Sequence, residues 1–345
     1  QNLKNKYSAI YMAAGETRLN FAIKGPDAWG AKTSAFIEGE FTGAWGSGSY
    51  GGFRLRHAFI NFDWGKYSLL FGQTWESWGI MFPDALGRNE FVPFRRGQRS
   101  PQIRFTHNIN PNWQWYFGVF QPNYGAQGNW NTTDANLASN YGEISNMPRF
   151  FGEINWSTDK CGKIGNDKLL IGFGGEFGQD KVPIAWLATG PGYYDLSYSS
   201  KNVNSWAGSV KAFIPIIPEK KGDKTGSLFI KGHFTYGQNY RPFAAAVGGT
   251  YDAQIDPLFV SMTAPTSYTG YGQIGYYITD KVWANFLYGT LKNNYSQSAM
   301  FVNSSVPVSA IRTHRQWAAN VLYDVNPAVR MGVQFTNINT GFVYW

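Results

Sequence analysis

The stretch Asn112–Pro122 reads Asn-Trp-Gln-Trp-Tyr-Phe-Gly-Val-Phe-Gln-Pro, and its pattern decides the fold. Every second residue from Trp113 to Val119 is large and apolar, and the residues between them are polar, small or mixed. This alternation is typical of a β-strand with two unlike faces. Similar segments recur to the C-terminus, with polar turns between them. Repetition of this kind predicts an all-β, closed antiparallel transmembrane barrel, with lipid outside and water inside.

The composition agrees with a wall that is half apolar and half polar. Aromatic residues make up 18% of the 345 residues and charged residues 15%, yet the mean hydropathy is only −0.33. A soluble core with so many rings would need longer apolar runs than this sequence contains. No run of 18 apolar residues exists, which excludes a membrane-spanning helix. It does not exclude barrel strands, whose signal in each segment is much weaker.

The chain is basic, with a formal net charge of +8 at pH 7. A solvated basic surface and nucleic-acid binding are two possible reasons. We find no basic helix, zinc-ligand spacing or RNA-recognition motif, so we expect no nucleic-acid partner. A pore lined with positive charge, which attracts anions, is the third reason. The placement of the charges along the strands favours it.

The residues that carry catalysis in other proteins form no recognisable set here. Cys161 is the only cysteine, and the four histidines lie on separate predicted strands. No HExxH, GxSxG or phosphate-binding glycine loop occurs. We therefore expect neither an enzyme nor a bound metal or cofactor. The chain begins without a charged and apolar leader, so we expect a processed polypeptide.

We predict about sixteen strands in one barrel domain that spans residues 1–345. The first and last are the weakest: one alternates poorly, and the other has only five residues, so we expect native residues to be missing at one or both ends. The predicted strands are Tyr7–Ala13, Thr17–Gly25, Lys32–Thr42, Gly52–Phe62, Tyr67–Ser77, Gln102–Asn108, Trp113–Gln121, Arg149–Trp156, Leu169–Phe177, Ser205–Ile216, Ser227–Tyr236, Thr269–Ile278, Val282–Gly289, Arg312–Tyr323, Val329–Thr336 and Gly341–Trp345.

Short and long connections alternate along most of the chain. Outer-membrane barrels have short periplasmic turns and long extracellular loops, so this asymmetry also predicts the orientation. Aromatic residues such as Trp64, Tyr67, Trp113 and Trp156 lie beside the short turns, as expected at a membrane interface. The long connections are expected at Gly79–Pro101, Pro122–Met147, Gln179–Lys201, Gln238–Tyr268 and Lys292–Ile311.

The face opposite each apolar row is predicted to line the channel. A charge on the lipid face costs about 2–4 kcal/mol at the bilayer midplane, so the many Arg and Lys residues should point inward. Acidic side chains share this lining and could neutralise some of the cations across the wall. The predicted lining residues on strands are Arg18, Arg54, Arg56, Arg104, Arg149, Lys231, Arg330, Glu38 and Glu40.

The connection at residues 79–100 is too apolar in its first half for a freely solvated loop. It is also longer than most loops without a function. We expect it to fold into the barrel and to narrow the pore with Arg95, Arg96 and Arg99. Packing on top of the barrel, or at a subunit interface, is the alternative.

Five stretches in the first third of the chain resemble, in order, the DcaP-like porins of Gram-negative outer membranes. They are Thr17–Phe21, Ala35–Phe41, Arg54–Ala58, Leu70–Trp75 and Arg99–Phe105. The resemblance implies a trimeric, sixteen-stranded porin that passes small solutes, preferably anions such as dicarboxylates.

The sequence thus predicts a Gram-negative outer-membrane diffusion channel with an anion preference, surrounded by lipid and assembled as a homotrimer. A substrate-specific uptake barrel and a non-conducting structural barrel remain the alternatives.

Overall fold

The structure is a computed structural model, and the regular elements in its described part are strands. The described residues contain no helix that is long and apolar enough to cross a membrane. These residues are 17–43, 52–76, 78–86, 91, 94, 99–121, 147–187, 196–238, 240, 254–255, 262–263, 266–294, 310–327 and 329–343.

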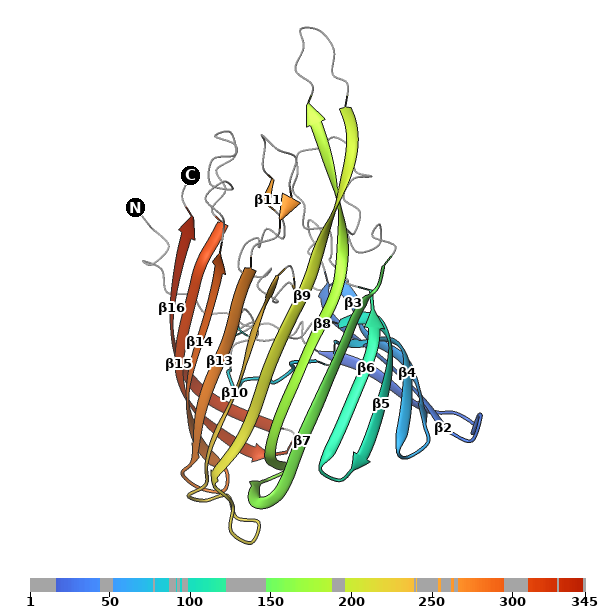
Figure 1. Cartoon of the computed structure of the whole chain (residues 1–345). Coiled ribbons are helices and arrows are strands. Elements are labelled where there is room, and N and C mark those ends of the chain that lie inside the picture. Colours follow the sequence, from blue (N-terminus) through green and yellow to red (C-terminus); the bar gives the residue numbers. More distant parts are fainter. Residues whose placement is uncertain are drawn as a thin grey trace.

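Fourteen strands form one antiparallel sheet in which each strand pairs with its neighbours in the chain (Figure 1). The only break in numbering comes from β11 (Gln254–Ile255) and β12 (Met262–Thr263), which pair with each other in a separate small sheet. The main sheet consists of β1 (Arg18–Lys24), β2 (Lys32–Gly43), β3 (Gly52–Asp63), β4 (Tyr67–Trp75), β5 (Arg99–Asn110), β6 (Trp113–Phe120), β7 (Arg149–Ile164), β8 (Asp167–Leu187), β9 (Leu196–Ile217), β10 (Leu228–Gln238), β13 (Thr266–Tyr277), β14 (Val282–Asn294), β15 (Ala310–Asn326) and β16 (Val329–Val343).

The predicted all-β antiparallel architecture is confirmed, and two of the sixteen predicted strands account for the difference in number. The first, Tyr7–Ala13, lies outside the described residues. The last, Gly341–Trp345, is wrong as a separate strand, because β16 continues without interruption to Val343. Its partner β15 is long enough to pair with it throughout, from Asn326 opposite Val329 to Ala310 opposite Val343.

The predicted long loop at Gln179–Lys201 is also wrong over most of its length. Strands β8 and β9 extend through it and pair as far as Leu187 opposite Leu196. The backbone hydrogen bonds of a hairpin can continue whatever the side-chain pattern. Alternation alone therefore ended β8 too early and began β9 too late. In Figure 1 this hairpin rises well above the other strands.

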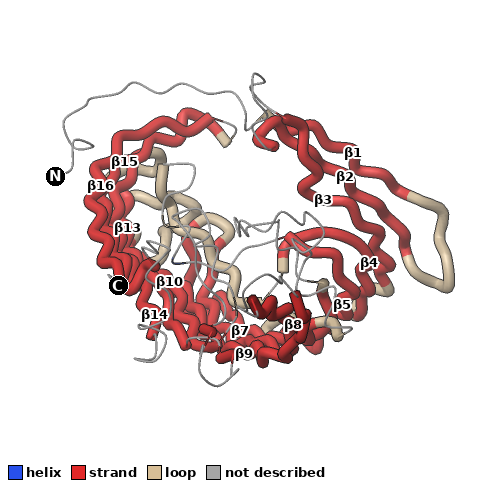
Figure 2. Tube along the Cα trace, turned by 90° about the horizontal axis from the view of Figure 1, so that it is seen from above, coloured by secondary structure: helices blue, strands red, loops and turns tan. Residues whose placement is uncertain are grey.

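The strands follow one another around a ring, which is seen from above in Figure 2. Among the described residues this ring is open, with β1 and β16 as the two edges of the sheet. A connection drawn in tan runs inside the ring, beside the strands of the C-terminal half. The sheet therefore encloses a lumen that is partly filled by the chain itself.

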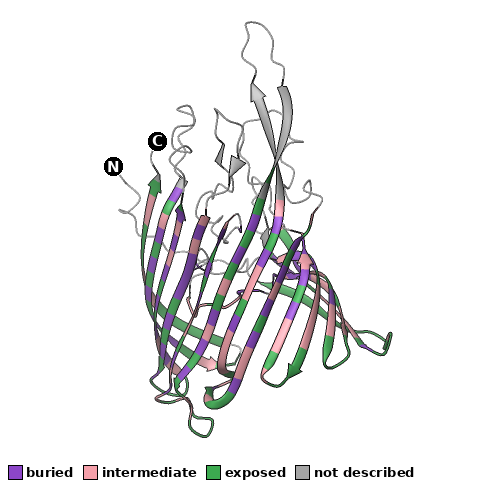
Figure 3. Cartoon of the chain, viewed as in Figure 1, coloured by how far each residue is buried: buried purple, intermediate pink, exposed green. Residues whose placement is uncertain are grey.

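The two faces of the sheet differ as the alternation predicted, and exposed and buried residues follow each other along most strands (Figure 3). On β3, Leu55 is 48% exposed while the neighbouring Arg56 is buried. The edge strand β1 is exposed along its whole length, and Phe21 there has 67% of its surface accessible. On β8, Phe173 and Phe177 are exposed while Glu176 between them is buried. A contiguous belt of exposed apolar side chains marks a surface for lipid or for another protein.

Rings with a polar edge gather where short turns join the strands. Trp64, Tyr67 and Trp113 are each about two-fifths exposed, and the rings of Trp113 and Trp156 lie 6.4 Å apart on neighbouring strands. Such amphipathic rings favour the level of the lipid headgroups. This end of the barrel therefore has the aromatic girdle that the sequence predicted.

Candidate functional site

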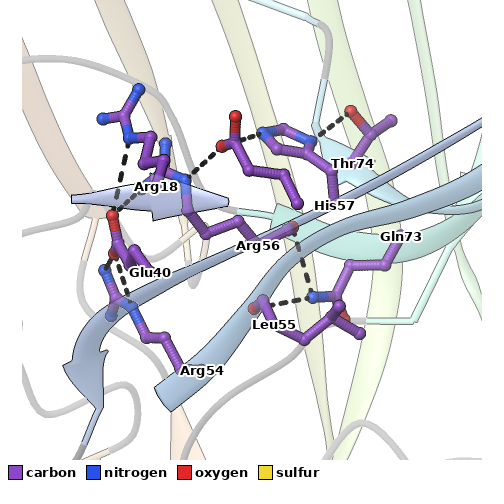
Figure 4. A network of polar contacts seen from close by, with 9 residues as sticks. Arg18, Glu40, Arg54, Leu55, Arg56, His57, Gln73 and Thr74 are labelled. Carbon is purple, nitrogen blue, oxygen red and sulfur yellow. Dashed lines mark hydrogen bonds and ion pairs between the residues drawn. The ribbon is translucent and has the colours of Figure 1, made fainter. Parts of the chain in front are cut away.

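Three arginines meet one carboxylate where β1, β2 and β3 lie side by side (Figure 4). Glu40 pairs across the sheet with Arg18 on one side and with Arg54 on the other. Glu40 Oε1 accepts a hydrogen bond from Arg54 Nε at 2.7 Å, and Oε2 lies 2.6 Å from Arg56 Nη1 and 3.7 Å from Arg18 Nε. Only 2% of Glu40 is exposed. The three cations together stabilise this buried negative charge.

The same network continues from Arg56 toward β4. Arg56 Nε donates to Glu38 Oε1 at 2.6 Å, and the ring of His57 lies between Glu38 and Thr74. Residues two apart on a strand share a face, which is why Glu38 and Glu40 reach one set of arginines. The spacing in the sequence predicted this shared face, and the structure adds the pairing.

Two other predicted arginines have no carboxylate within ion-pair distance among the described residues. The Arg99 guanidinium carbon lies 4.5 Å from the centre of the Trp75 ring, and that of Arg104 lies 6.0 Å from the centre of the Tyr116 ring. A ring face attracts a cation without neutralising it. Both positive charges therefore remain available to a passing anion.

The remaining predicted cations are paired with acids. Arg149 Nη1 donates to Glu176 Oε1 at 2.9 Å, Arg330 pairs with Asp324, and Lys231 pairs with Asp84. Arg95 and Arg96 lie outside the described residues. Most of the predicted lining cations in the described part of the chain are thus paired with acids, and Arg99 and Arg104 on β5 are the two that are not.

The connection after β4 leaves the wall and crosses the interior. Trp78 Nε1 donates to Glu176 Oε2 at 3.1 Å, and the N–H of Gly79 donates to Glu153. Further along, Tyr271 of β13 donates from its hydroxyl to the carbonyl of Met81 at 3.0 Å. Residues 78–81 therefore run from the β7–β8 wall to the β13 wall.

Asp84 and Leu86 hold the middle of this crossing segment against four strands. Asp84 pairs with Lys231 of β10, and its backbone N–H donates to Gln273 of β13 at 3.0 Å. Its carbonyl accepts a hydrogen bond from Asn320 of β15 at 2.7 Å, and the next contact, from the Leu86 N–H to Gln334 of β16, is 2.9 Å long. Sequence reasoning missed Asp84, because its partners lie 147–236 positions away in the chain.

Two phenylalanines anchor the later part of the connection to the wall formed by β13, β14 and β15. Phe91 and Phe94 are fully buried, in one apolar cluster with Tyr271 of β13 and with residues of β14 and β15. The Phe94 ring also stacks on His314 at 5.3 Å. Opposite Phe94, a Cβ at Gly289 would lie 2.2 Å from the ring, so the wall keeps a glycine where the ring enters.

A cavity of about 680 Å³ opens on the other side of the lumen, along β5–β9. Its lining includes Trp75 and Ile80, and then the β5–β6 turn and the first residues of β8. The guanidinium group of Arg99 lies over the ring of Trp75. Trp75 and Tyr116, the rings beneath Arg99 and Arg104, thus both line the cavity, on the side of the lumen that lies away from the docked phenylalanines.

Solved structures with the same architecture are known. The outer-membrane channel DcaP of Acinetobacter baumannii matches 96% of this chain and 80% of its own, with a TM-score of 0.68 and 15% identity. The trimer form of OmpT, an outer membrane protein of Vibrio cholerae, matches 94% of this chain and 81% of its own, with a TM-score of 0.54 and 9% identity. OmpF of Salmonella typhi, solved in complex with daunomycin, matches 92% of this chain and 81% of its own, with a TM-score of 0.52 and 11% identity.

No protein-family model matches the chain, and no curated protein matches it by sequence. The similarity to the solved structures is accordingly one of fold. It confirms, at that level, the resemblance that the first third of the sequence suggested. The chain has the porin fold of Gram-negative outer membranes, with DcaP among its structural neighbours.

Proposed function

We propose that this chain is an outer-membrane porin through which small hydrophilic solutes diffuse passively, with a preference for anions. The observation that carries the proposal is the pair Arg99 and Arg104, two inner cations on β5 without a carboxylate partner among the described residues. The channel requires no moving part and no energy source. Solutes enter from one mouth, pass the cations and leave at the other.

The connection at residues 79–100 acts as the constriction in this proposal. Its first half is held across the lumen by Asp84, and Phe94 is buried against the far wall. Passage is then restricted to the side lined by β1–β9. Charges matter most in such a narrow region, because little water is left to screen them.

The paired charges have a second role. On β1–β3 the arginines and glutamates form a fixed array of opposite charges, which orients a dipolar solute and disfavours a bare cation. An anion exchanges part of its hydration for contact with guanidinium groups, which present several donors in one plane. Because no site needs to bind tightly, the anion can leave as easily as it enters.

Charge removal on β5 tests the anion preference. The double variant R99Q/R104Q should lower the anion-over-cation permeability ratio at least about threefold in planar bilayers at low salt. Coulomb's law gives roughly 0.5 kcal/mol for one unit charge about 8 Å from an ion in water, with opposite signs for the two ions. K66Q, on the exposed β3–β4 turn, is the matched control. An unchanged reversal potential in R99Q/R104Q would remove the proposed selectivity, and bilayers without any conductance steps would favour a structural barrel instead.

Removal of an acid should shift selectivity in the opposite direction. In E40Q the amide cannot neutralise Arg18, Arg54 and Arg56, which now share one carboxylate fewer. We expect the reversal potential to move further toward that of the anion, by about the effect of one unit charge. The measurement is the zero-current potential in a salt gradient. An unchanged zero-current potential in E40Q would show that this network does not face the conducting path.

The homotrimer and the dicarboxylate preference belong to the same proposal. The exposed apolar belt offers a lateral surface that lipid alone or neighbouring copies could cover, and a Vibrio cholerae protein with this fold was solved as a trimer. The side chains of Arg18 and Arg54, on either side of Glu40, are 46% and 41% exposed, so two carboxylates on one solute could contact them together. Measurement of the particle mass in detergent tests the trimer. The dicarboxylate preference is tested by comparing the currents that succinate and propionate carry when both are present.

A further inference from the structure

The cavity along β5–β9 has an unusual concentration of side-chain amides near the short-turn end. Asn108 and Gln114 face each other across β5 and β6, with Gln114 Nε2 donating to Asn108 Oδ1 at 2.7 Å. Asn112, in the turn between these strands, donates from Nδ2 to the carbonyl of Ser157 at 2.6 Å. All three line the cavity.

These internal hydrogen bonds leave defined atoms for a ligand. Among the described residues, Asn108 Nδ2 keeps its donors, while Gln114 Oε1 and Asn112 Oδ1 keep their acceptor capacity. Donors and acceptors thus lie next to each other along one rim. A hydroxyl group both donates and accepts, so a row of hydroxyls matches such a rim better than a carboxylate alone does.

One ammonium group stands over the same cavity without an acid. Lys168 Nζ contacts the carbonyl of Pro111 at 3.4 Å and has no carboxylate in ion-pair distance within the described part of the chain. The other lining lysine, Lys211, is already 2.6 Å from Glu153 Oε1. Lys168 is therefore the group in this cavity that can take a carboxylate from solution.

We propose that this cavity is a second station on the solute path, which binds a small polyhydroxylated carboxylate such as a sugar acid. Lys168 holds the carboxylate, and the amides of Asn108, Asn112 and Gln114 hold the hydroxyls. A volume of about 680 Å³ is in the usual range of small-molecule sites. Trp75 connects the station to Arg99. The inference rests on the proposed channel function and adds the solute class to it.

Solute-induced current fluctuations test the station in single channels of the full chain. Gluconate is compared with propionate, which has the carboxylate only, and with sorbitol, which has the hydroxyls only. We expect gluconate to bind at least about tenfold more tightly than either, since only gluconate uses both sets of groups. K168Q should lower the affinity for gluconate about three- to tenfold and leave the affinity for sorbitol unchanged. Q114M should lower the affinity for both solutes.

The matched control is K160Q, which removes one exposed lysine charge from the β7–β8 hairpin outside the cavity. If K160Q lowers the affinity for gluconate as much as K168Q does, the effect comes from the general electrostatic field, and the proposed station is refuted. Equal affinities for gluconate and propionate would refute the hydroxyl contacts. A conducting channel that gluconate never interrupts overturns this inference and leaves the porin intact, whereas the absence of conductance overturns the porin itself.

Discussion

Replacement of Arg149 by methionine is expected to destabilise the folded barrel by about 3–5 kcal/mol. Arg149 is 1% exposed, and the side chain of its partner Glu176 is fully buried. Without the guanidinium, the carboxylate keeps the cost of leaving water and loses the charge that offsets it. The free energy of unfolding is measured by urea titration in detergent micelles, with tryptophan fluorescence as the signal.

The double variant R149M/E176Q separates the buried charge from the loss of packing. Glutamine keeps an oxygen that can accept the hydrogen bond from Trp78 Nε1, and no uncompensated charge remains. We expect this variant to recover most of the stability lost in R149M. If the double variant is as unstable as R149M, then packing around Arg149, and not the ion pair, explains the loss.

Replacement of Phe94 by alanine is expected to release the crossing connection from the wall. Phe94 is fully buried between β14 and β15, and such Phe-to-Ala changes cost about 3–5 kcal/mol. A loss of 3 kcal/mol raises the undocked population more than about a hundredfold. Single-channel recordings should then show larger conductance and more open-channel noise, because the lumen of the C-terminal half becomes accessible.

Two further variants make this result specific to docking. F82A changes a phenylalanine on the same connection that is 41% exposed, so it should leave the open-channel noise near that of the parent. G289V fills the position of the Phe94 ring from the wall side and should reproduce the noise of F94A. Quiet channels of unchanged conductance in both F94A and G289V would contradict a docked constriction.

The sequence by itself determined the all-β antiparallel architecture and the rows of exposed apolar side chains. The reason is that alternation with period two is a local property: a residue's face follows from its place on the strand, whatever the strand pairs with. Phe21, Phe173 and Phe177 point outward for this reason alone. The spacing of Glu38 and Glu40, and of Arg54 and Arg56, likewise determined that each pair shares a face.

Only the tertiary structure decided which of those charges remain available. Arg149 and Lys231 are neutralised by Glu176 and Asp84, whereas Arg99 and Arg104 rest on aromatic rings. Nothing in the one-dimensional pattern distinguishes these cases. An ion pair depends on distance between strands and across the lumen, which strand register and the path of the crossing connection determine together. The same reason explains why the sequence did not single out Asp84 and Lys168. The partners of Asp84 and the cavity beside Lys168 are formed by residues that are distant in the sequence and that only the folded sheet brings together.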